Sequence, residues 1–362
     1  MAHGMRILFL LEDLCYGGTQ RQTLELAARL DRRRFVPVML TLTGPTDLDG
    51  LAGQAGIDVH NLGRDRRLAP FFFARLGTAL RRLRPDVLVP CTALPNIWGR
   101  LWGRALGLPV LGTVRGGGGP KRQHERFLWR LAQHIVCNSE ALYDVLQRLG
   151  VPPRRLSHVP NGVDTDVFCA PASSLPVSAR PPRLLCVARL AGDKDHPTLL
   201  RAFARVLERH PDAVLRLVGD GPEERRLRQW ADAHPAGRRV EFVPGRPDVR
   251  EEYDGARLFV LSSVREGQPN VLLEAMSCGL PLCATAVGGI PRLITDGENG
   301  FLCGPGDDAA LARQICRLLE DPPLGDRMGQ AGRERAVRDF SFARMVAAHE
   351  ALFERLAGGD AC

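Results

Sequence analysis

Two acidic side chains and the short segment between them are the part of the sequence best suited to chemistry. Glu266 lies in a loop, and Glu274 lies eight residues later on a short helix that is apolar nearly all round. Because burying an unpaired carboxylate costs several kcal/mol, Glu274 must have hydrogen-bond partners. Gly267 allows close approach of the backbone, and the N–H groups of the helix start at Asn270 and Val271 form a natural site for a phosphate.

The elements that position this segment are expected to be strand, loop, helix and strand. A short apolar strand covers Leu258–Leu261, and Pro269 suits the first turn of the helix because its missing N–H would be unpaired there. Gly279 and Pro281 then end the helix. Taken singly, each glutamate has an ordinary alternative: the first as a solvated loop acid, the second as the partner of a neighbouring arginine. The combination is more specific than its parts.

A second pair of charged residues, Arg189 and Lys194, follows a strand that starts at Arg183. An isolated arginine and lysine on a loop would normally be solvated. The only other lysine in the chain is Lys121, however, and the pair follows a buried strand closely. These two residues are therefore candidates for the counterions of a diphosphate.

Glycines follow the first strand of the chain. Gly17 and Gly18 separate an apolar strand at 6–11 from an amphipathic helix at 20–30, the place where parallel α/β folds bind phosphate. A tight turn would use the same two residues. The dinucleotide fingerprint G-x-G-x-x-G is absent from the whole chain, which disfavours a dehydrogenase.

These segments resemble the retaining glycosyltransferases of family 4. The matching motifs are an E-x7-E signature at 266–274, an R-L-x-x-x-K loop at 189–194, an N-G-V-D turn at 161–164 and an L-V-G-D-G-P strand end at 217–222. The resemblance covers nearly the whole chain, from the Gly-Gly loop to the last helix. It implies an α/β fold of the GT-B type, with two Rossmann-like domains facing a central cleft.

The resemblance also implies roles for single residues around the two acids. Glu266 would contact the hydroxyls of the donor sugar, with Gly267 beside it, and Glu274 would contact the ribose hydroxyls. Asn270 and Val271 would bind the phosphate through their backbone N–H groups.

Other donor-side roles follow from the same resemblance. Arg189 and Lys194 would stabilise the leaving diphosphate without a metal ion. Gly18 and Gly219 would lie close to the donor, the former approaching both the diphosphate and the acceptor. The family usually has glycine after the lysine, and Asp195 stands there in this chain, which predicts an altered turn.

The acceptor side departs from the family pattern. Many members have histidine where Arg115 stands, at the end of a strand at 110–114 and before four consecutive glycines. His124 lies just downstream. We take Arg115 and His124 as acceptor-side candidates.

The domain division is predicted from composition and from the restart of the strand and helix alternation. Residues 1–170 form the acceptor-side domain, and a proline-rich linker covers 171–182. The donor-binding domain covers 183–339, and a last helix at 340–357 packs back on the first domain.

Charge is distributed unevenly between the two halves. Residues 1–171 contain 23 Lys+Arg and 14 Asp+Glu, a net charge of +9. The remainder contains 26 Lys+Arg and 27 Asp+Glu, a net charge of −1, so that the whole chain carries +8. The asymmetry suggests that the first half meets something anionic. The basic helix at 70–84, with three phenylalanines, could lie on an anionic membrane or cover the sheet with solvated arginines.

Three other classes of protein are less well supported. Three D-x-D strings, at 47–49, 164–166 and 193–195, could hold Mn²⁺ or Mg²⁺, but none follows a convincing buried strand. Nucleic-acid binding is disfavoured because no aromatic residues alternate with the arginines. The ten cysteines contain no C-x-x-C pattern, which favours free thiols in a reducing cytoplasm over a disulfide or metal framework.

We therefore predict a glycosyltransferase that is retaining, independent of metal and without a cofactor. The donor is a nucleotide-diphosphate sugar, UDP- or GDP-linked, and the acceptor is a lipid-linked or polysaccharide glycan. The enzyme is expected to be cytoplasmic and peripheral at the inner face of an anionic membrane. Another GT-B enzyme, such as a nucleotide-sugar epimerase or a phosphorylase, and a soluble small-molecule acceptor remain alternatives.

Overall fold

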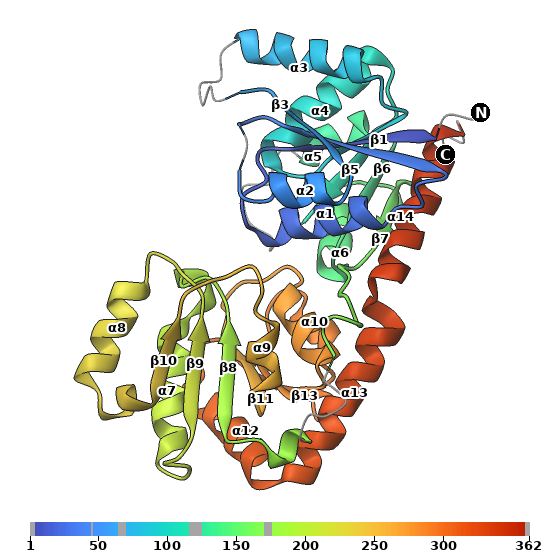
Figure 1. Cartoon of the computed structure of the whole chain (residues 1–362). Helices are drawn as coiled ribbons and strands as arrows, with labels where there is room; N and C mark the ends of the chain where they lie inside the picture. Colours follow the sequence, from blue (N-terminus) through green and yellow to red (C-terminus); the bar gives the residue numbers. More distant parts are fainter. Residues whose placement is uncertain (1–3, 45, 64–69, 116–124, 170–175, 359–362) are drawn as a thin grey trace. The chain divides into compact units, whose positions relative to one another are not determined.

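The chain folds into two compact units, each built on its own parallel sheet (Figure 1). The computed structural model describes residues 4–44, 46–63, 70–115, 125–169 and 176–358. One unit comprises Met1–Asn161 and Phe342–Cys362, and the other comprises Gly162–Ser341. The prediction of an α/β fold with two Rossmann-like domains is confirmed.

In the described part of the first unit, seven parallel strands form the sheets, in the spatial orders β3-β2-β1-β4 and β5-β6-β7. A bridge between Leu88 and Val110 connects the two sets. Residues alternate between two cores: Ile7 and Phe9 face one, Leu8 faces the other. The strands are β1 Met5–Leu11, β2 Phe35–Thr41, β3 Asp58–Asn61, β4 Val87–Pro90, β5 Leu111–Val114, β6 His134–Cys137 and β7 Leu156–His158.

Helices bury both faces of this sheet. The C-terminal helix α14 packs on α1 in the core that contains Ile7, and Phe353 contacts Phe9 and Phe35 edge-on. The helices are α1 Gly18–Arg29, α2 Asp49–Gln54, α3 Pro70–Leu83, α4 Ala93–Leu106, α5 Glu125–Leu128, α6 Glu140–Arg148 and α14 Phe342–Ala357, with 3-10 turns at Trp129–Leu131 and Pro153–Arg155.

Six parallel strands form the sheet of the second unit, in the order β10-β9-β8-β11-β12-β13 (Figure 1). The chain moves outward from β8 to β10 and then crosses back to β11, so the direction of winding reverses between β8 and β11. Ligands of open parallel sheets bind at such a reversal, outside the carboxyl ends of the strands. The strands are β8 Arg183–Val187, β9 Val214–Val218, β10 Val240–Val243, β11 Leu258–Leu261, β12 Leu282–Thr285 and β13 Gly300–Cys303.

The second sheet also separates two cores. Leu184 and Cys186 of β8 pack with α7 and α12, whereas Leu185 faces the core that contains α10. The helices are α7 His196–Leu207, α8 Glu224–Ala233, α9 Arg250–Asp254, α10 Asn270–Ser277, α11 Ile290–Leu293, α12 Asp308–Glu320 and α13 Pro322–Phe340, with 3-10 turns at Val177–Ala179, Gly192–Lys194 and Pro235–Arg239.

The division between the units falls earlier than the predicted linker at 171–182. It lies between Asn161 and Gly162, because residues 162–169 are already packed in the second unit, while residues 171–175 of the predicted linker lie outside the described residues. The N–H of Val163 donates to the carbonyl of Phe340 at 2.8 Å, and Phe168 lies edge-on to Tyr253. Proline content alone therefore placed this boundary too late in the chain.

Candidate active site

The two charged loops predicted from the sequence meet at the reversal point of the second sheet. Lys194 lies in the loop after β8, and Glu266 lies in the loop after β11. Because β8 and β11 are neighbouring parallel strands, their carboxyl ends lie at the same edge of the sheet. The Lys194 ammonium lies 2.6 Å from Glu266 Oε1.

Glu266 is held by two donors. Besides Lys194, the hydroxyl of Ser263 donates to its Oε1 at 2.7 Å. The side chain of Glu266 is 9% exposed and that of Lys194 is 19% exposed, so this pair is well shielded from water but still reachable. A carboxylate fixed in this way can accept hydrogen bonds from sugar hydroxyls with its remaining lone pairs.

Arg189 occupies a different position from Lys194. Its side chain is 69% exposed and lies 3.5 Å from Asp193, which also lies 3.5 Å from Lys194. Burial acts to raise the pKa of Asp193, but the charges of Lys194 and Arg189 and the hydrogen bonds to the carboxylate together outweigh it, so the pKa is lowered. Lys194 and Glu266 are therefore brought together, whereas Arg189 remains a solvent-facing cation at the rim.

Hydrogen bonds to backbone carbonyls join the two loops. The hydroxyl of Ser262 donates to the carbonyls of Lys194 and Asp195 at 2.9 and 3.0 Å, and the N–H of Val264 donates to the carbonyl of Asp193 at 3.0 Å. These bonds fix the loops before any ligand binds, which is the kind of preorganisation that binding sites require.

Asp195 keeps the turn that glycine would make. Its φ is 47°, in the left-handed region that favours glycine, and aspartate tolerates this region better than most residues. Its side chain also caps α7, with Oδ2 accepting from the Thr198 hydroxyl at 2.6 Å. The left-handed backbone that suits glycine is therefore present at Asp195, and the cap offsets its strain.

Gly219 packs against the backbone of Ala188, at the start of the loop that contains Lys194. Its φ is 147°, and a Cβ there would overlap the carbonyl oxygen of Ala188. The next residues support the same loop, since the N–H of Leu190 donates to the carbonyl of Asp220 at 2.8 Å. A contact of Gly219 with a donor remains a prediction.

Helix α10 begins four residues after Glu266. Pro269 is the residue before the helix rather than part of its first turn, and no side chain caps the helix there. Asn270 and Val271 are thus its first two residues, as expected. The N–H of Gly289 donates to the carbonyl of Gly267 at 2.8 Å, which ties the glutamate loop to the Gly-Gly turn after β12.

Glu274 is buried and hydrogen-bonded, as its place on an apolar helix required. It is 5% exposed, and the Tyr253 hydroxyl donates to its Oε2 at 2.7 Å. Tyr253 comes from α9 and is fully buried. Sequence reasoning missed this partner because no local spacing connects the two residues. It also missed Ser263, although that serine lies three residues before Glu266.

Gly18, predicted on the donor side, and Arg115, predicted on the acceptor side, both lie in the first unit. Gly18 is the first residue of α1, directly after the loop that follows β1. Arg115 follows β5, and its Nη1 donates to Asn161 Oδ1 at 3.3 Å. His124 lies outside the described residues.

Several acids of the D-x-D strings accept hydrogen bonds from backbone N–H groups. Asp47 accepts from the N–H of Tyr16 at 3.2 Å, and Asp164 accepts from the N–H groups of Asp166 and Val167 at 3.1 and 3.0 Å. Asp193 and Asp195 have the roles given above. Independence of a metal ion remains a prediction.

Potential metal ligands come together elsewhere in the second unit. His210, Cys316 and Glu320 have ligand atoms within 4.8 Å of one another. Arg209 lies 2.6 Å from Glu320 and already balances its charge. The cluster follows the carboxyl end of α7, whereas Lys194 precedes its start, and a helix of 12 residues is about 18 Å long.

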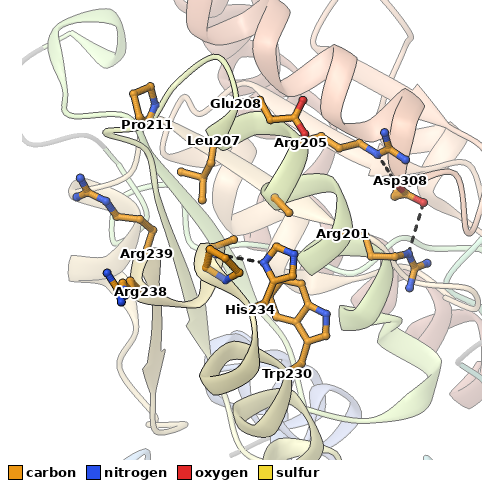
Figure 2. A pocket seen from close by; sticks show the side chains of 13 residues that line it. Arg201, Arg205, Leu207, Glu208, Pro211, Trp230, His234, Arg238, Arg239 and Asp308 are labelled. Carbon is orange, nitrogen blue, oxygen red and sulfur yellow. Dashed lines mark hydrogen bonds and ion pairs between the residues drawn. The ribbon is translucent and has the colours of Figure 1, made fainter.

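A basic hollow also lies away from the candidate site (Figure 2). Its volume is about 830 Å³, and it lies between α7, α8 and the turn before β10. Trp230 stacks on His234, while Arg201 and Arg205 reach Asp308. This hollow contains none of the predicted site residues, so we place the chemistry at the Lys194 and Glu266 loops.

Two glycosyltransferase family models match consecutive parts of the chain. The model for family 4 glycosyltransferases matches residues 16–167, and the model for group 1 glycosyl transferases matches residues 173–335. Each model thus falls almost wholly within one of the two structural units.

Curated relatives carry related names. The chain is 37% identical over 155 residues to N-acetyl-alpha-D-glucosaminyl L-malate synthase of Bacillus anthracis, an alignment that spans 43% of this chain and only 40% of that protein. It is 29% identical to the lipopolysaccharide core biosynthesis glycosyltransferase LpsE of Rhizobium meliloti, over 90% of this chain and 92% of that protein.

Solved structures share the fold. HepE of Anabaena in complex with UDP-glucose superposes with a TM-score of 0.84 at 22% identity, over 96% of this chain and 99% of that one. Sucrose-phosphate synthase of Thermosynechococcus elongatus superposes with a TM-score of 0.82 at 22% identity, over 98% of this chain and 100% of that one. The fold is therefore that of the GT-B enzymes. Together with the family matches, it makes the chain a glycosyltransferase.

Proposed function

We propose that the protein transfers a sugar from a UDP- or GDP-linked donor to a lipid-linked or polysaccharide glycan, with retention of configuration and without a metal ion. The pairing of Lys194 with Glu266 beside the start of α10 carries this proposal. It places a cation, a carboxylate and a helix N-terminus at one edge of the sheet. A nucleotide-diphosphate sugar needs all three kinds of group.

Each group has a distinct task in the proposed reaction. The bond between the anomeric carbon and the diphosphate oxygen breaks, and a bond from that carbon to the acceptor oxygen forms on the same face of the sugar. The acceptor proton passes to the leaving phosphate, so no protein base is required. Lys194 and Arg189 balance the charge that develops on the diphosphate, while Glu266 orients the sugar.

The nucleotide would be recognised at α10. Its uncapped start faces the diphosphate through the N–H groups of Asn270 and Val271, and Glu274 binds the ribose hydroxyls one to two turns later. A relative, HepE of Anabaena, was crystallised with UDP-glucose, and another from Mycolicibacterium smegmatis is named a GDP-mannose-dependent mannosyltransferase. These names support the choice of UDP and GDP as the first donors to test.

The acceptor proposal rests on the charge of the first unit. Arg81 and Arg82 in the last turn of α3 are exposed, and so is Arg84, which follows the helix. Phe73, however, stacks on Trp102 at 4.6 Å, so its ring is used inside the unit. Membrane docking through α3 would therefore depend on charge, without the apolar contribution of Phe73 that the sequence suggested. No helix among the described residues has the length and apolarity to span a bilayer.

A panel of nucleotides tests the proposed donor. UDP or GDP at millimolar concentration should raise the thermal unfolding temperature, since a ligand that binds only the folded state stabilises it. Donor sugar should then release free nucleotide only when an acceptor is added. Release of free nucleotide without any acceptor, or epimerisation of the donor sugar, would indicate a different GT-B reaction.

A further inference from the structure

The carboxyl ends of three neighbouring strands in the first unit carry a connected set of polar side chains. Arg115 follows β5, Asn138 follows β6, and Asn161 lies three residues after β7. Asn161 Oδ1 accepts from Arg115 Nη1 at 3.3 Å and from Asn138 Nδ2 at 3.2 Å. The three residues thus form one hydrogen-bonded row at the edge of the sheet.

The charge of Arg115 has no counter-ion in this row. Among the described residues it makes no ion pair, and the neighbouring stretch 116–124 contains no acidic residue. Although part of the side chain is exposed, its surroundings are dense and burial lowers the pKa of its guanidinium. The Cys91 thiol interacts with the Arg115 charge, but burial raises the pKa of that thiol to about 11, so it is neutral and supplies no negative charge.

Two buried polar atoms close to Arg115 also have no partner. Asn138 is 5% exposed and His349 is 1% exposed, yet Oδ1 of the former and Nε2 of the latter make no hydrogen bond in the described part of the chain. Burial lowers the pKa of His349 to about 4, and the nearby Arg115 charge acts in the same direction. The imidazole is therefore neutral, and its Nδ1–H donates to Met345. Both orphan atoms are hydrogen-bond acceptors.

An unpaired cation next to two unpaired acceptors fits one kind of ligand. Guanidinium groups bind carboxylates and phosphates, and unpaired buried acceptors are satisfied by hydroxyl donors. A neutral sugar would leave the Arg115 charge unbalanced. An ion without hydroxyls would leave Asn138 unpaired.

We propose that Arg115, Asn138 and Asn161 form a subsite for an acidic sugar unit of the acceptor, with its carboxylate or phosphate on Arg115. Asn138 Oδ1 accepts a hydrogen bond from a hydroxyl of the same sugar unit, and Asn161 orients the guanidinium of Arg115. This inference rests on the proposed glycosyl transfer, since it assigns the acceptor. The positive charge of the first unit then concentrates acidic glycans at the subsite.

Three small probes distinguish the sources of the anion. Glucuronate carries a carboxylate, glucose 1-phosphate carries a phosphate, and glucose carries neither. Each is titrated by calorimetry into the wild-type protein saturated with UDP or GDP, so that the cations of the second unit are occupied. At least one charged probe should bind about tenfold or more tightly than glucose. Equal binding of all three probes, or no binding of any, overturns the proposal.

Variants separate the subsite from a structural role. Arg115→Gln should abolish the preference for the charged probe, and Arg115→Lys should restore part of it. Arg238→Gln, at an exposed arginine of the basic hollow in Figure 2, is the matched control and should keep the full preference. A preference that survives in Arg115→Gln contradicts the assignment.

Stability supplies a second readout. Removing an uncompensated charge should leave the unfolding temperature of ligand-free Arg115→Met unchanged or higher than that of the wild type. A clearly lower unfolding temperature would mean that Arg115 is structural. If neither UDP nor GDP binds, the proposed function fails on its own. The comparison of probes is then repeated without nucleotide and still decides the role of Arg115.

Discussion

The Lys194 ammonium lies 2.6 Å from Glu266 Oε1 and joins the loops after β8 and β11. The pair keeps the two charges balanced. A donor diphosphate would take over Lys194 and leave Glu266 to the sugar hydroxyls. The two residues should therefore respond differently to substitution.

Glu266→Gln should lower turnover more than nucleotide affinity. The substitution removes the charge but keeps the shape, and it frees Lys194 for the diphosphate, so affinity for UDP or GDP should be equal or higher. Loss of hydrogen bonds to a charged group corresponds to about 1.5–3 kcal/mol, or about 10- to 100-fold in turnover. Steady-state kinetics and calorimetry check this. Unchanged turnover would remove Glu266 from the reaction.

Glu274→Ala should weaken nucleotide affinity while the protein still folds. The expected loss is about 1–3 kcal/mol, the cost of leaving buried partners unpaired. Tyr253→Phe is the matched control, because it deletes the hydroxyl that donates to Glu274 but keeps the carboxylate. Its main effect should be on the unfolding temperature. If both variants bind nucleotide as the wild type does, Glu274 is purely structural.

Activity should persist in excess chelator. The proposed counter-charges are Lys194 and Arg189, and the D-x-D acids already have other partners. The measurement is acceptor-dependent nucleotide release with and without EDTA. Complete loss that Mn²⁺ restores would show that a metal ion serves the diphosphate.

Stability should fall on acidification between about pH 6.5 and pH 4. Burial lowers the pKa of His196 to about 4, with the Lys194 charge acting in the same direction. The unfolded chain binds its proton near pH 6.5, so the stability contribution is full above that pH and is lost toward pH 4. In this range, each buried neutral histidine makes the free energy of unfolding fall by about 1.4 kcal/mol for each pH unit of acidification.

A single substitution isolates this effect. Both ring nitrogens of His196 lack partners in the described residues, so His196→Leu should keep the fold and reduce the slope by one proton. Denaturant unfolding at pH 5 and pH 7 measures it. His60→Leu, at an exposed position, serves as the control. Identical slopes in His196→Leu and the wild type would contradict the buried, neutral histidine.

Binding to anionic vesicles should depend on the arginines in the last turn of α3 and directly after it. Flotation with anionic vesicles at low salt should retain the wild type, since each basic residue near such a surface contributes about 1 kcal/mol. Replacing Arg81, Arg82 and Arg84 with glutamine should release it, while Arg238→Gln should not. Absence of binding to anionic vesicles would favour a soluble acceptor.

Local sequence patterns predicted the elements well because their causes are local. Apolar runs and the residues that interrupt them placed β11 and α10 within a few residues of their observed bounds. The domain boundary was misplaced because it depends on contacts. Val163 and Phe168 are bound to distant residues of the second unit, and no nearby pattern shows this.

Site residues that belong to a sequence motif could be predicted. Lys194, Glu266 and Glu274 could be named, but the partner of Glu274 could not, since Tyr253 comes from another helix. The buried pair of Arg100 and Glu125, 2.7 Å apart, was missed for the same reason. A charge that is paired across the fold looks in sequence like any solvated charge.

The most direct test of the central claim is calorimetric titration of UDP and GDP, in the presence of EDTA, into the wild type and Lys194→Met. Lys194→Met keeps the length of the side chain and removes the only charge that contacts Glu266 directly from the β8 loop. We predict that one of the two nucleotides binds the wild type and binds the variant at least about tenfold more weakly, while Arg238→Gln binds as the wild type does. Equal affinity in Lys194→Met and the wild type, with both proteins folded, would contradict a diphosphate site at the Lys194 and Glu266 loops.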